Sequence, residues 1–391
     1  MKRFLKTLIL VLMTVCLLAF AIGCGDNPED DTKGLKVTKY NGDDYYTVYG
    51  YVGEEDVTKL DLAEEAEKLS EEKGVEVVIG RIKANTFSGN ETIKELIVPT
   101  TVEVMDAGAF AGMRNLEKLT IPFVGKTANA DSYYGESAKG EKSVDSERTF
   151  GYLFGTESFN FGTQIKQNYD ANNSISTYLP LSLKEVTVKP EGEYKLPYYA
   201  FSGNNLLRKV NLNGNITVIG EYAFKDCSAL TTITDGTNIT LPTSVVDIKK
   251  GAFSGCINLK GADGTLNTGF SIANCANLTV IGESAFEKVG LREIVIPDSV
   301  TVIGARCFKQ SAVCAVATNA KFIGDYAFYE CAELTTVLID LTQIESIGNY
   351  AFGKCEVLKY VGGSSATEYV VAVDATKVLA NAFAETNMVI A

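Results

Sequence analysis

The feature that most constrains this chain is a short pattern of residue types that recurs from residue 82 to the C-terminus. Each unit reads Ile-Gly, then Ala-Phe, then a small or apolar residue and two aliphatic residues at the third, sixth and ninth positions after the phenylalanine. Most of the phenylalanines are 20 to 33 residues apart. They are Phe87, Phe110, Phe201, Phe224, Phe253, Phe286, Phe308, Phe328, Phe352 and Phe383.

A unit of this length cannot close a hydrophobic core by itself, so its apolar side is buried only when units stack. The pattern therefore predicts a mainly β repeat solenoid with few short helices. Its short strands are expected to join in one long parallel sheet, and its phenylalanines to form a stacked spine. The glycine after each isoleucine fits either a turn with positive φ or a close approach of two backbones.

The composite pattern IGxxAFxxCxxLxxIxLPxxVxxIG resembles the BspA-like leucine-rich repeat family of bacterial cell-surface (lipo)proteins. A period in the twenties is also the one that leucine-rich repeats use. The resemblance covers about residues 75–391. It implies exposure at the cell surface and, in some members, adhesion to host or bacterial partners, and it provides no catalytic motif to transfer.

The N-terminus has the pattern of an export signal. Three basic residues precede an apolar run, Leu8–Ile22, and the sequence AIGC follows at residues 21–24. This ending resembles a lipobox, which predicts a lipoprotein signal peptide at 1–23 and a lipid on Cys24. The alternatives are a signal peptide that is cut without lipidation and an uncleaved anchor helix, although the run is shorter than the ~20 residues that span a bilayer.

We therefore expect an exported protein that is held at the cell membrane, facing outside, by a lipid on Cys24. The polar segment 24–34 is expected to be a flexible tether. Loss of residues 1–23 removes three basic residues and no acidic one, so the formal net charge changes from −13 to −16. This acidity argues against nucleic acid as a partner.

Residues 35–80 precede the first clear unit and predict an N-terminal cap, followed by the leucine-rich repeat solenoid at 81–391. An Asn-Gly-Asp sequence at 41–43 between β-prone stretches indicates a hairpin. Residues 60–74 carry apolar residues at helical spacing and end in a glycine that is typical of a helix C-cap. The cap would cover the exposed end of the stack, and a functional surface on the Tyr-rich hairpin is the alternative.

The pattern breaks between Phe110 and Phe201, which are 91 residues apart. Residues 123–180 are expected to form an inserted loop or small subdomain. The segment is rich in Tyr, Ser, Gly and Asn, as adaptable binding loops are. The alternatives are a self-packed decoration, whose aromatic side chains bury one another, and disorder. The candidate ligand-binding residues are Tyr133, Tyr134, Tyr152, Phe154, Tyr169 and Tyr178.

Seven of the nine cysteines follow Cys24, since Cys16 lies in the signal. Five of them stand three residues before the leucine of their repeat, a position that indicates a small buried hydrophobe. Cys307 and Cys314 are the candidates for a disulfide, which export would permit. No CxxC motif is present, so neither a zinc cluster nor a redox motif is indicated.

The sequence contains no histidine, which excludes Ser-His-Asp and Cys-His catalytic sites and His-ligated metals. Its 49 acidic residues provide carboxylate pairs by chance, and no pair stands out. A carboxylate-based glycan hydrolase is therefore the weakest of the alternatives. We expect no catalytic residue, no metal site and no cofactor.

The interpretation that follows is a non-enzymatic cell-surface lipoprotein that binds an extracellular protein or glycan. Polar pairs at the strand entry of successive coils, such as Lys94-Glu95 and Lys184-Glu185, form either the contact surface or an ordinary solvated face. A structural cell-envelope scaffold without an external ligand is the alternative. The sequence favours neither the insert nor the sheet as the place of contact.

Overall fold

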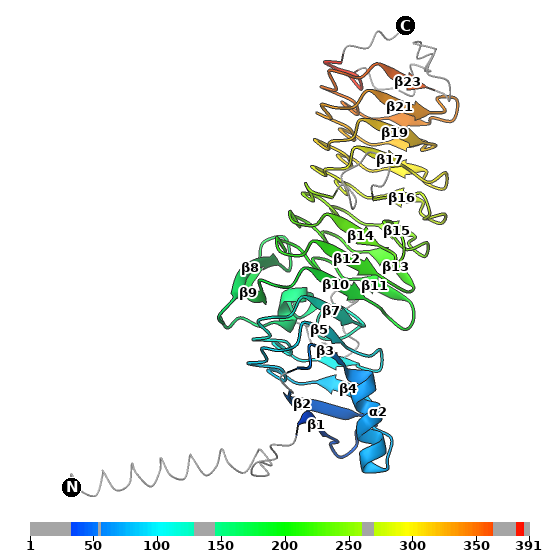
Figure 1. Ribbon diagram of the computed structural model, residues 1–391. Helices are drawn as coiled ribbons and strands as arrows, with labels where there is room; N and C mark the ends of the chain where they lie inside the picture. Colours follow the sequence, from blue (N-terminus) through cyan, green and yellow to red (C-terminus); the bar gives the residue numbers. More distant parts are fainter. Residues whose placement is uncertain (1–32, 54–55, 129–144, 260–269, 363–380, 387–391) are drawn as a thin grey trace, which may run out of the picture.

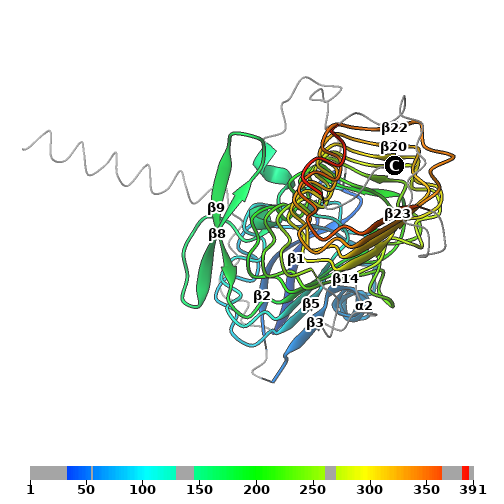
Figure 2. The same cartoon turned by 90° about the horizontal axis from the view of Figure 1, so that it is seen from above.

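The computed structural model describes residues 33–53, 56–128, 145–259, 270–362 and 381–386. They form an elongated solenoid whose coils stack from β1 (Gly34–Thr38) near one end to β23 (Tyr360–Gly362) near the other (Figure 1). Figure 2 views the stack along its axis, where successive coils overlap in one outline. The hairpin of β8 (Gly162–Asn168) and β9 (Ser174–Pro180) lies outside that outline.

The N-terminal segment contains the hairpin and the helix that the sequence predicted. β1 pairs antiparallel with β2 (Tyr46–Val52). The helix α2 (Leu62–Lys73) begins after Asp61, whose carboxylate accepts a hydrogen bond from the Ala63 N–H at 2.9 Å. It ends at Gly74, which has a φ of 66°. Both ends therefore follow ordinary capping rules.

The sheets continue across the predicted boundary between cap and repeats. β2 pairs in parallel with β4 (Ile79–Ile82), and β3 (Lys59–Asp61) pairs in parallel with β5 (Glu95–Ile97). The cap is therefore built as the first coil of the stack, and its hydrophobic residues belong to the same core as the repeats.

The expectation of one long parallel sheet is wrong, because most coils contribute two short strands to two different faces. The first face holds β3, β5, β7 (Lys118–Ile121), β10 (Glu185–Val188), β12 (Lys209–Leu212) and β14 (Thr232–Thr234), and then β17 (Glu293–Val295), β19 (Ala315–Thr318), β21 (Thr336–Ile339) and β23. The second holds β4 and β6 (Val104–Met105), and then β11 (Tyr194–Leu196), β13 (Ile216–Ile219), β15 (Asp247–Ile248), β16 (Val280–Ile281), β18 (Val302–Ile303), β20 (Phe322–Ile323) and β22 (Ser346–Ile347). Most units contain two β-prone stretches and use both.

The glycine after each isoleucine is explained by close packing of coils and not by positive φ. A Cβ on Gly220 would lie 2.4 Å from the carbonyl oxygen of Leu196 in the preceding coil. A Cβ on Gly304 would lie 2.6 Å from the Glu283 nitrogen. Positive φ angles occur instead on both sides of the phenylalanine, for example at Ser284 (54°) and Lys288 (56°).

The phenylalanines form a column along the core. From Phe201 to Phe383, consecutive rings have centroids 5.1 to 5.3 Å apart and interplanar angles of 3° to 13°. Four cysteines at the third position after a phenylalanine are buried, and each thiol donates to a phenylalanine carbonyl of the preceding coil; they are Cys227, Cys256, Cys331 and Cys355. Cys227 bonds to the Phe201 oxygen at 3.1 Å and Cys331 to the Phe308 oxygen at 3.0 Å. Burial also raises the pKa of Cys275 to about 12.

The gap in the repeat pattern does not interrupt this column, because part of the segment predicted to be an inserted loop or small subdomain, residues 123–180, belongs to the stack. Two short 3₁₀ helices, η1 (Asp145–Arg148) and η2 (Phe150–Leu153), form a further coil. The Phe154 ring lies 6.0 Å from Phe110, and the Phe150 ring lies 5.1 Å from Phe201. Of the described part of the insert, mainly the β8–β9 hairpin projects from the stack.

The candidate disulfide between Cys307 and Cys314 is not formed. Both thiols are free, as are the other cysteines that the structure describes. Cys307 stands in the alanine position before Phe308 and is fully buried, whereas Cys314 is partly exposed next to β19.

Candidate functional site

The residues proposed from sequence as ligand contacts fall into three groups. Tyr133 and Tyr134 lie outside the described residues, as does Cys24. Tyr169 and Tyr178 lie on the β8–β9 hairpin and are partly exposed. Tyr152 packs against the core, and burial raises its pKa to about 12, an effect that Glu147 reinforces.

Phe154 must be removed from the set of ligand contacts. Its side chain is 0% exposed, between the rings of Phe110 and Phe150. Its function is therefore to continue the hydrophobic column through the coil that the insert supplies. Local sequence did not indicate this, because the GYLFG stretch lacks the Ile-Gly that marks the other coils.

Gln167 holds the hairpin against the stack. Its side chain is 1% exposed and points from β8 into the coil interface. The amide oxygen accepts a bond from the Gly151 N–H at 2.8 Å, and the amide nitrogen donates to the Ala200 and Tyr199 carbonyls at 2.7 and 3.1 Å. One buried side chain thereby joins the hairpin, η2 and the coil of Phe201, which fixes the base of the hairpin.

The second face is interrupted at the coil where the insert begins. In regular corners a proline is followed by a hydroxyl residue that bonds to the preceding coil, as Ser244 does to the Ile216 carbonyl at 2.8 Å. After β7 the chain instead reads Pro122-Phe123-Val124-Gly125. The parallel ladder of the second face therefore ends at β6 and resumes at β11.

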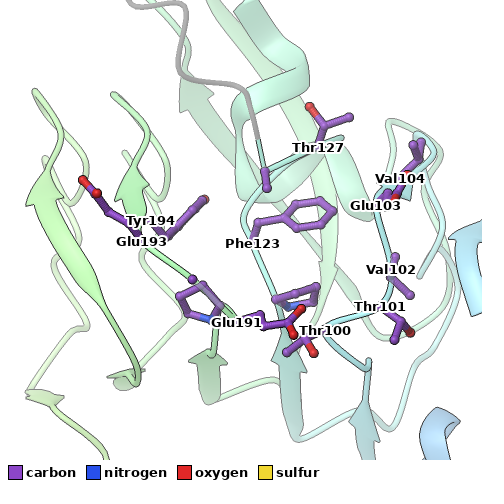
Figure 3. Close-up of a pocket in the computed structure, with 14 residues that line it drawn as sticks. Thr100, Thr101, Val102, Glu103, Val104, Phe123, Thr127, Glu191, Glu193 and Tyr194 are labelled. Atoms are coloured by element: carbon purple, nitrogen blue, oxygen red, sulfur yellow. The ribbon is translucent and has the colours of Figure 1, made fainter.

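A cleft of about 640 Å³ occupies this interruption. Figure 3 shows Phe123 at its base, between a wall formed by residues 100–104 and a wall formed by residues 190–194. Pro122 and Pro190 add apolar surface to the lining. The volume lies within the range of ~300–1,000 Å³ that is usual for ligand pockets.

The polar groups of the cleft are acidic or neutral. Three glutamates line it, Glu103, Glu191 and Glu193, and no lysine or arginine lies among the lining residues that the structure describes. Glu193 accepts a hydrogen bond from the Thr217 hydroxyl at 3.1 Å. Figure 3 shows the Glu191 side chain extended toward Thr100 on the opposite wall. In the part of the chain that the structure describes, Glu103 and Glu191 have no side-chain hydrogen bond or ion pair.

Two hydroxyl groups fix the walls of the cleft. The Tyr194 hydroxyl accepts a bond from the Val124 N–H at 3.0 Å, which ties the wall at 190–194 to its base. The Thr101 hydroxyl donates to the Ile79 carbonyl at 2.8 Å in the preceding coil. Both walls are therefore held before any ligand enters.

The chemistry that this arrangement supports is binding of a cation with an apolar stem. Carboxylates accept hydrogen bonds from ammonium or guanidinium groups, and the proline and phenylalanine side chains cover hydrocarbon. Among the described residues, no group of three or more His, Cys, Asp or Glu could hold a metal ion. Nor does any helix within those residues have the length and apolar character needed to cross a membrane.

Reasoning from sequence did not find this cleft, because it arises where an element is absent. None of Glu103, Phe123 and Glu191 carries a recognisable motif. The available signal was the loss of the hydroxyl and valine that follow proline in regular corners such as 242–245.

Comparison with known proteins identifies the family of the repeats but does not indicate a ligand. The model of the "BspA type Leucine rich repeat region", in six copies, matches residues 75–139, 234–263 and 264–388, which is more than half of the chain. No curated protein matches the chain.

Several solved structures are similar to the chain at low sequence identity. A leucine-rich repeat protein from Bacteroides ovatus ATCC 8483 is 19% identical, with 86% of this chain and 79% of that chain covered and a TM-score of 0.40. The T. pallidum leucine-rich repeat protein is 23% identical over 52% of this chain and 90% of that chain, with a TM-score of 0.35. A leucine-rich cell surface protein from Faecalibacterium prausnitzii A2-165 is 16% identical over 92% and 87%, with a TM-score of 0.27.

Proposed function

The chain belongs to the BspA type leucine-rich repeat family, and we propose that it is an exported, lipid-anchored, non-enzymatic module that binds an extracellular protein or glycan. Proteins of this family are generally associated with the cell surface, and leucine-rich repeats typically serve as interaction modules. The absence of histidine from the sequence agrees with a role in binding instead of catalysis.

One observation carries the proposal, namely that a continuous and rigid stack has a preformed cleft at the irregular corner between β6 and β11. A stack of coils holds its surface in fixed positions, which lowers the entropy lost when a partner binds. Charges on the neighbouring coils largely satisfy one another. Lys94 lies 3.5 Å from Glu117, and Lys209 lies 3.0 Å from Glu185. This pairing favours the cleft and the adjacent hairpin over the strand-entry residues as the contact surface.

The lipid anchor is tested by changing Cys24. Cells that express the full chain are grown with labelled palmitate, alongside cells that express Cys24→Ser or Cys16→Ser. We expect Cys24→Ser to lose the label and to leave the membrane fraction, and Cys16→Ser to behave like the unchanged chain. Label and membrane attachment that persist in Cys24→Ser would contradict the anchor.

Binding is tested with the full-length chain in non-ionic detergent against a panel of purified extracellular proteins and glycans. Because Phe150 and Phe154 belong to the core, the insert cannot be deleted as a whole. The informative variant is Tyr169→Ala/Tyr178→Ala on the exposed hairpin. Saturable binding that this variant weakens would place the contact at the hairpin, and binding that it leaves intact would place the contact elsewhere. Self-association without any saturable ligand would contradict the proposal and favour an envelope scaffold.

A further inference from the structure

We propose that the cleft between residues 100–104 and 190–194 receives a basic side chain, an arginine in preference to a lysine, from a protein partner. This inference rests on the proposed binding function and names the class of partner. It follows from the shape of the cleft, from the charges that line it and from the burial of its aromatic residues.

The lining separates an apolar base from a charged rim. Pro122, Phe123 and Pro190 supply the base, and Glu103 and Glu191 come from opposite walls. Long basic side chains bury their methylene stems on apolar surface and keep the charged group among polar atoms. A guanidinium group also presents planar, forked donors that match carboxylates better than a single ammonium group does.

The two carboxylates are available, unlike others on the same coils. Glu117 pairs with Lys94, and Glu147 pairs with Lys126 at 3.0 Å. Within the described ranges, Glu103 and Glu191 have no such partner, and the lining contains no basic residue. The formal net charge of −13 adds a long-range attraction for basic ligands.

The aromatic residues favour a peptide over a glycan. Sugar rings commonly stack on an open aromatic face. Phe123 is only 2% exposed and Tyr194 only 4% exposed, so neither offers such a face. They form part of the apolar base of the cleft, which suits the hydrocarbon stem of a basic side chain.

The test is calorimetric titration of the full-length chain, in non-ionic detergent at low salt, with acetyl-Gly-Arg-Gly-amide. The same peptide with citrulline, which is neutral and almost the same shape, is the ligand control, and the lysine peptide tests the preference. The informative variant is Glu103→Gln/Glu191→Gln. Its matched control, Glu157→Gln/Glu287→Gln, removes the same charge at sites away from the cleft. Circular dichroism melting curves establish that both variants fold.

We expect the arginine peptide to bind more tightly than the lysine peptide, and the citrulline peptide to give no saturable heat. The cleft variant should weaken arginine binding at least tenfold, which corresponds to about 1.4 kcal/mol, and the control variant should change it by less than about twofold. These results together would support the inference.

Three results would overturn it. They are no saturable arginine binding up to about 10 mM, equal binding of the citrulline peptide, or an equal loss in both double variants, which would indicate general charge attraction. If the panel contains a saturable partner whose binding the cleft variant leaves unchanged, this inference fails and the proposed function stands. If the arginine peptide binds as expected but no panel member does, this inference stands and the proposed extracellular partner is contradicted.

Discussion

The coils before Phe201 and those after it bury the same kind of residue with different geometry. After Phe201, neighbouring phenylalanine rings are nearly parallel, with interplanar angles of 13° or less. Before it, the rings of Phe87 and Phe110 are 31° apart, those of Phe110 and Phe154 are 60° apart, and those of Phe150 and Phe201 are 38° apart. The column is continuous in both regions, but it is regular only in the second.

The difference teaches that this fold requires a filled core. It tolerates different backbone conformations in the segments that supply the buried side chains. The regular coils repeat the same turns, so their rings stack at the spacing of the coils. The insert supplies two phenylalanines from a 3₁₀ segment and leaves out one strand of the second face. The cleft lies at that omission. Regularity therefore serves stability here, and the irregular coil provides the candidate site.

The largest effect is expected from truncating the column. Phe308→Ala should lower the free energy of unfolding by about 4 kcal/mol, because a large cavity forms between two parallel rings. Phe154→Ala should cost about 3 kcal/mol, since Phe150 lies 5.2 Å away at a tilt and can move toward the space. Urea unfolding followed by circular dichroism measures both. Phe161→Ala, at a side chain that is 64% exposed, is the control and should cost less than about 0.5 kcal/mol.

Equal losses in the two core variants would remove the distinction between the regions, and a loss below about 1 kcal/mol for Phe154→Ala would mean that the insert does not share the core.

The next effect tests the close approach of coils. Gly304→Ala should lower stability by about 2 to 3 kcal/mol, because its Cβ would meet backbone atoms of the preceding coil at 2.6 Å. Gly192→Ala is the matched control, since no atom lies within 4 Å of its added Cβ. Thermal melting of the two variants provides the comparison. Similar melting temperatures would contradict the explanation that glycine is needed at this position because the backbones of neighbouring coils are in contact.

The hydrogen bonds of Gln167 at the base of the β8–β9 hairpin are expected to contribute less to stability. Gln167→Met keeps most of the volume but leaves the Gly151 N–H without its acceptor, which should cost about 2 kcal/mol. The measurement is hydrogen exchange of the Gly151 amide, which should become faster. Gln164→Met, at an exposed position of the same strand, should leave that rate unchanged. Equal rates in both variants would mean that the hairpin is held by other contacts.

The buried thiols predict a pH dependence. Burial raises the pKa of Cys275 to about 12, above its value of 9.0 in an exposed chain. Between these values the unfolded chain releases the proton and the folded chain keeps it, so stability falls as pH rises from 9 toward 12. From pH 8 to pH 10, Cys275→Ala should lose about 1.4 kcal/mol less stability than the unchanged chain. Identical losses would contradict the effect of burial.

The smallest effect concerns the turns beside each phenylalanine. Lys288 has a φ of 56°, a conformation that costs a side-chain-bearing residue more than it costs glycine. Lys288→Gly should therefore raise stability by about 0.5 to 1 kcal/mol. In the less regular region, Gly112 has a φ of 73°, and Gly112→Ala should lower stability by about 1 kcal/mol. Chemical unfolding measures both changes, and the same sign in the two variants would count against this account of the turns.

Much of the fold could be predicted from the sequence because each unit repeats the same types of buried residue at the same positions. The phenylalanine positions, the buried cysteines and the strand after each leucine all depend on local pattern. The second strand of each coil was missed because the stretch before Ile-Gly is short. Phe150 and Phe154 were missed because their coil has no Ile-Gly signal.

The site was harder to predict for a physical reason. A cleft formed by an omitted strand depends on which coils become neighbours across the gap. Glu103 and Glu191 are 88 positions apart in the chain and belong to opposite walls. The periodicity of the sequence does not show which coils become neighbours across the gap.

The central claim is that the segment from Asp145 to Phe154 is a coil of the solenoid, and amide hydrogen exchange of the full-length chain tests it most directly. The Phe150 N–H bonds to the Ala200 carbonyl at 2.8 Å, just as the Phe253 N–H bonds to the Ala285 carbonyl at 2.8 Å in the regular region. We predict that the two amides exchange with protection factors within about tenfold of each other, since both require opening of the stack. Exchange of Phe150 near the rate of an unstructured peptide, with Phe253 protected, would contradict the claim.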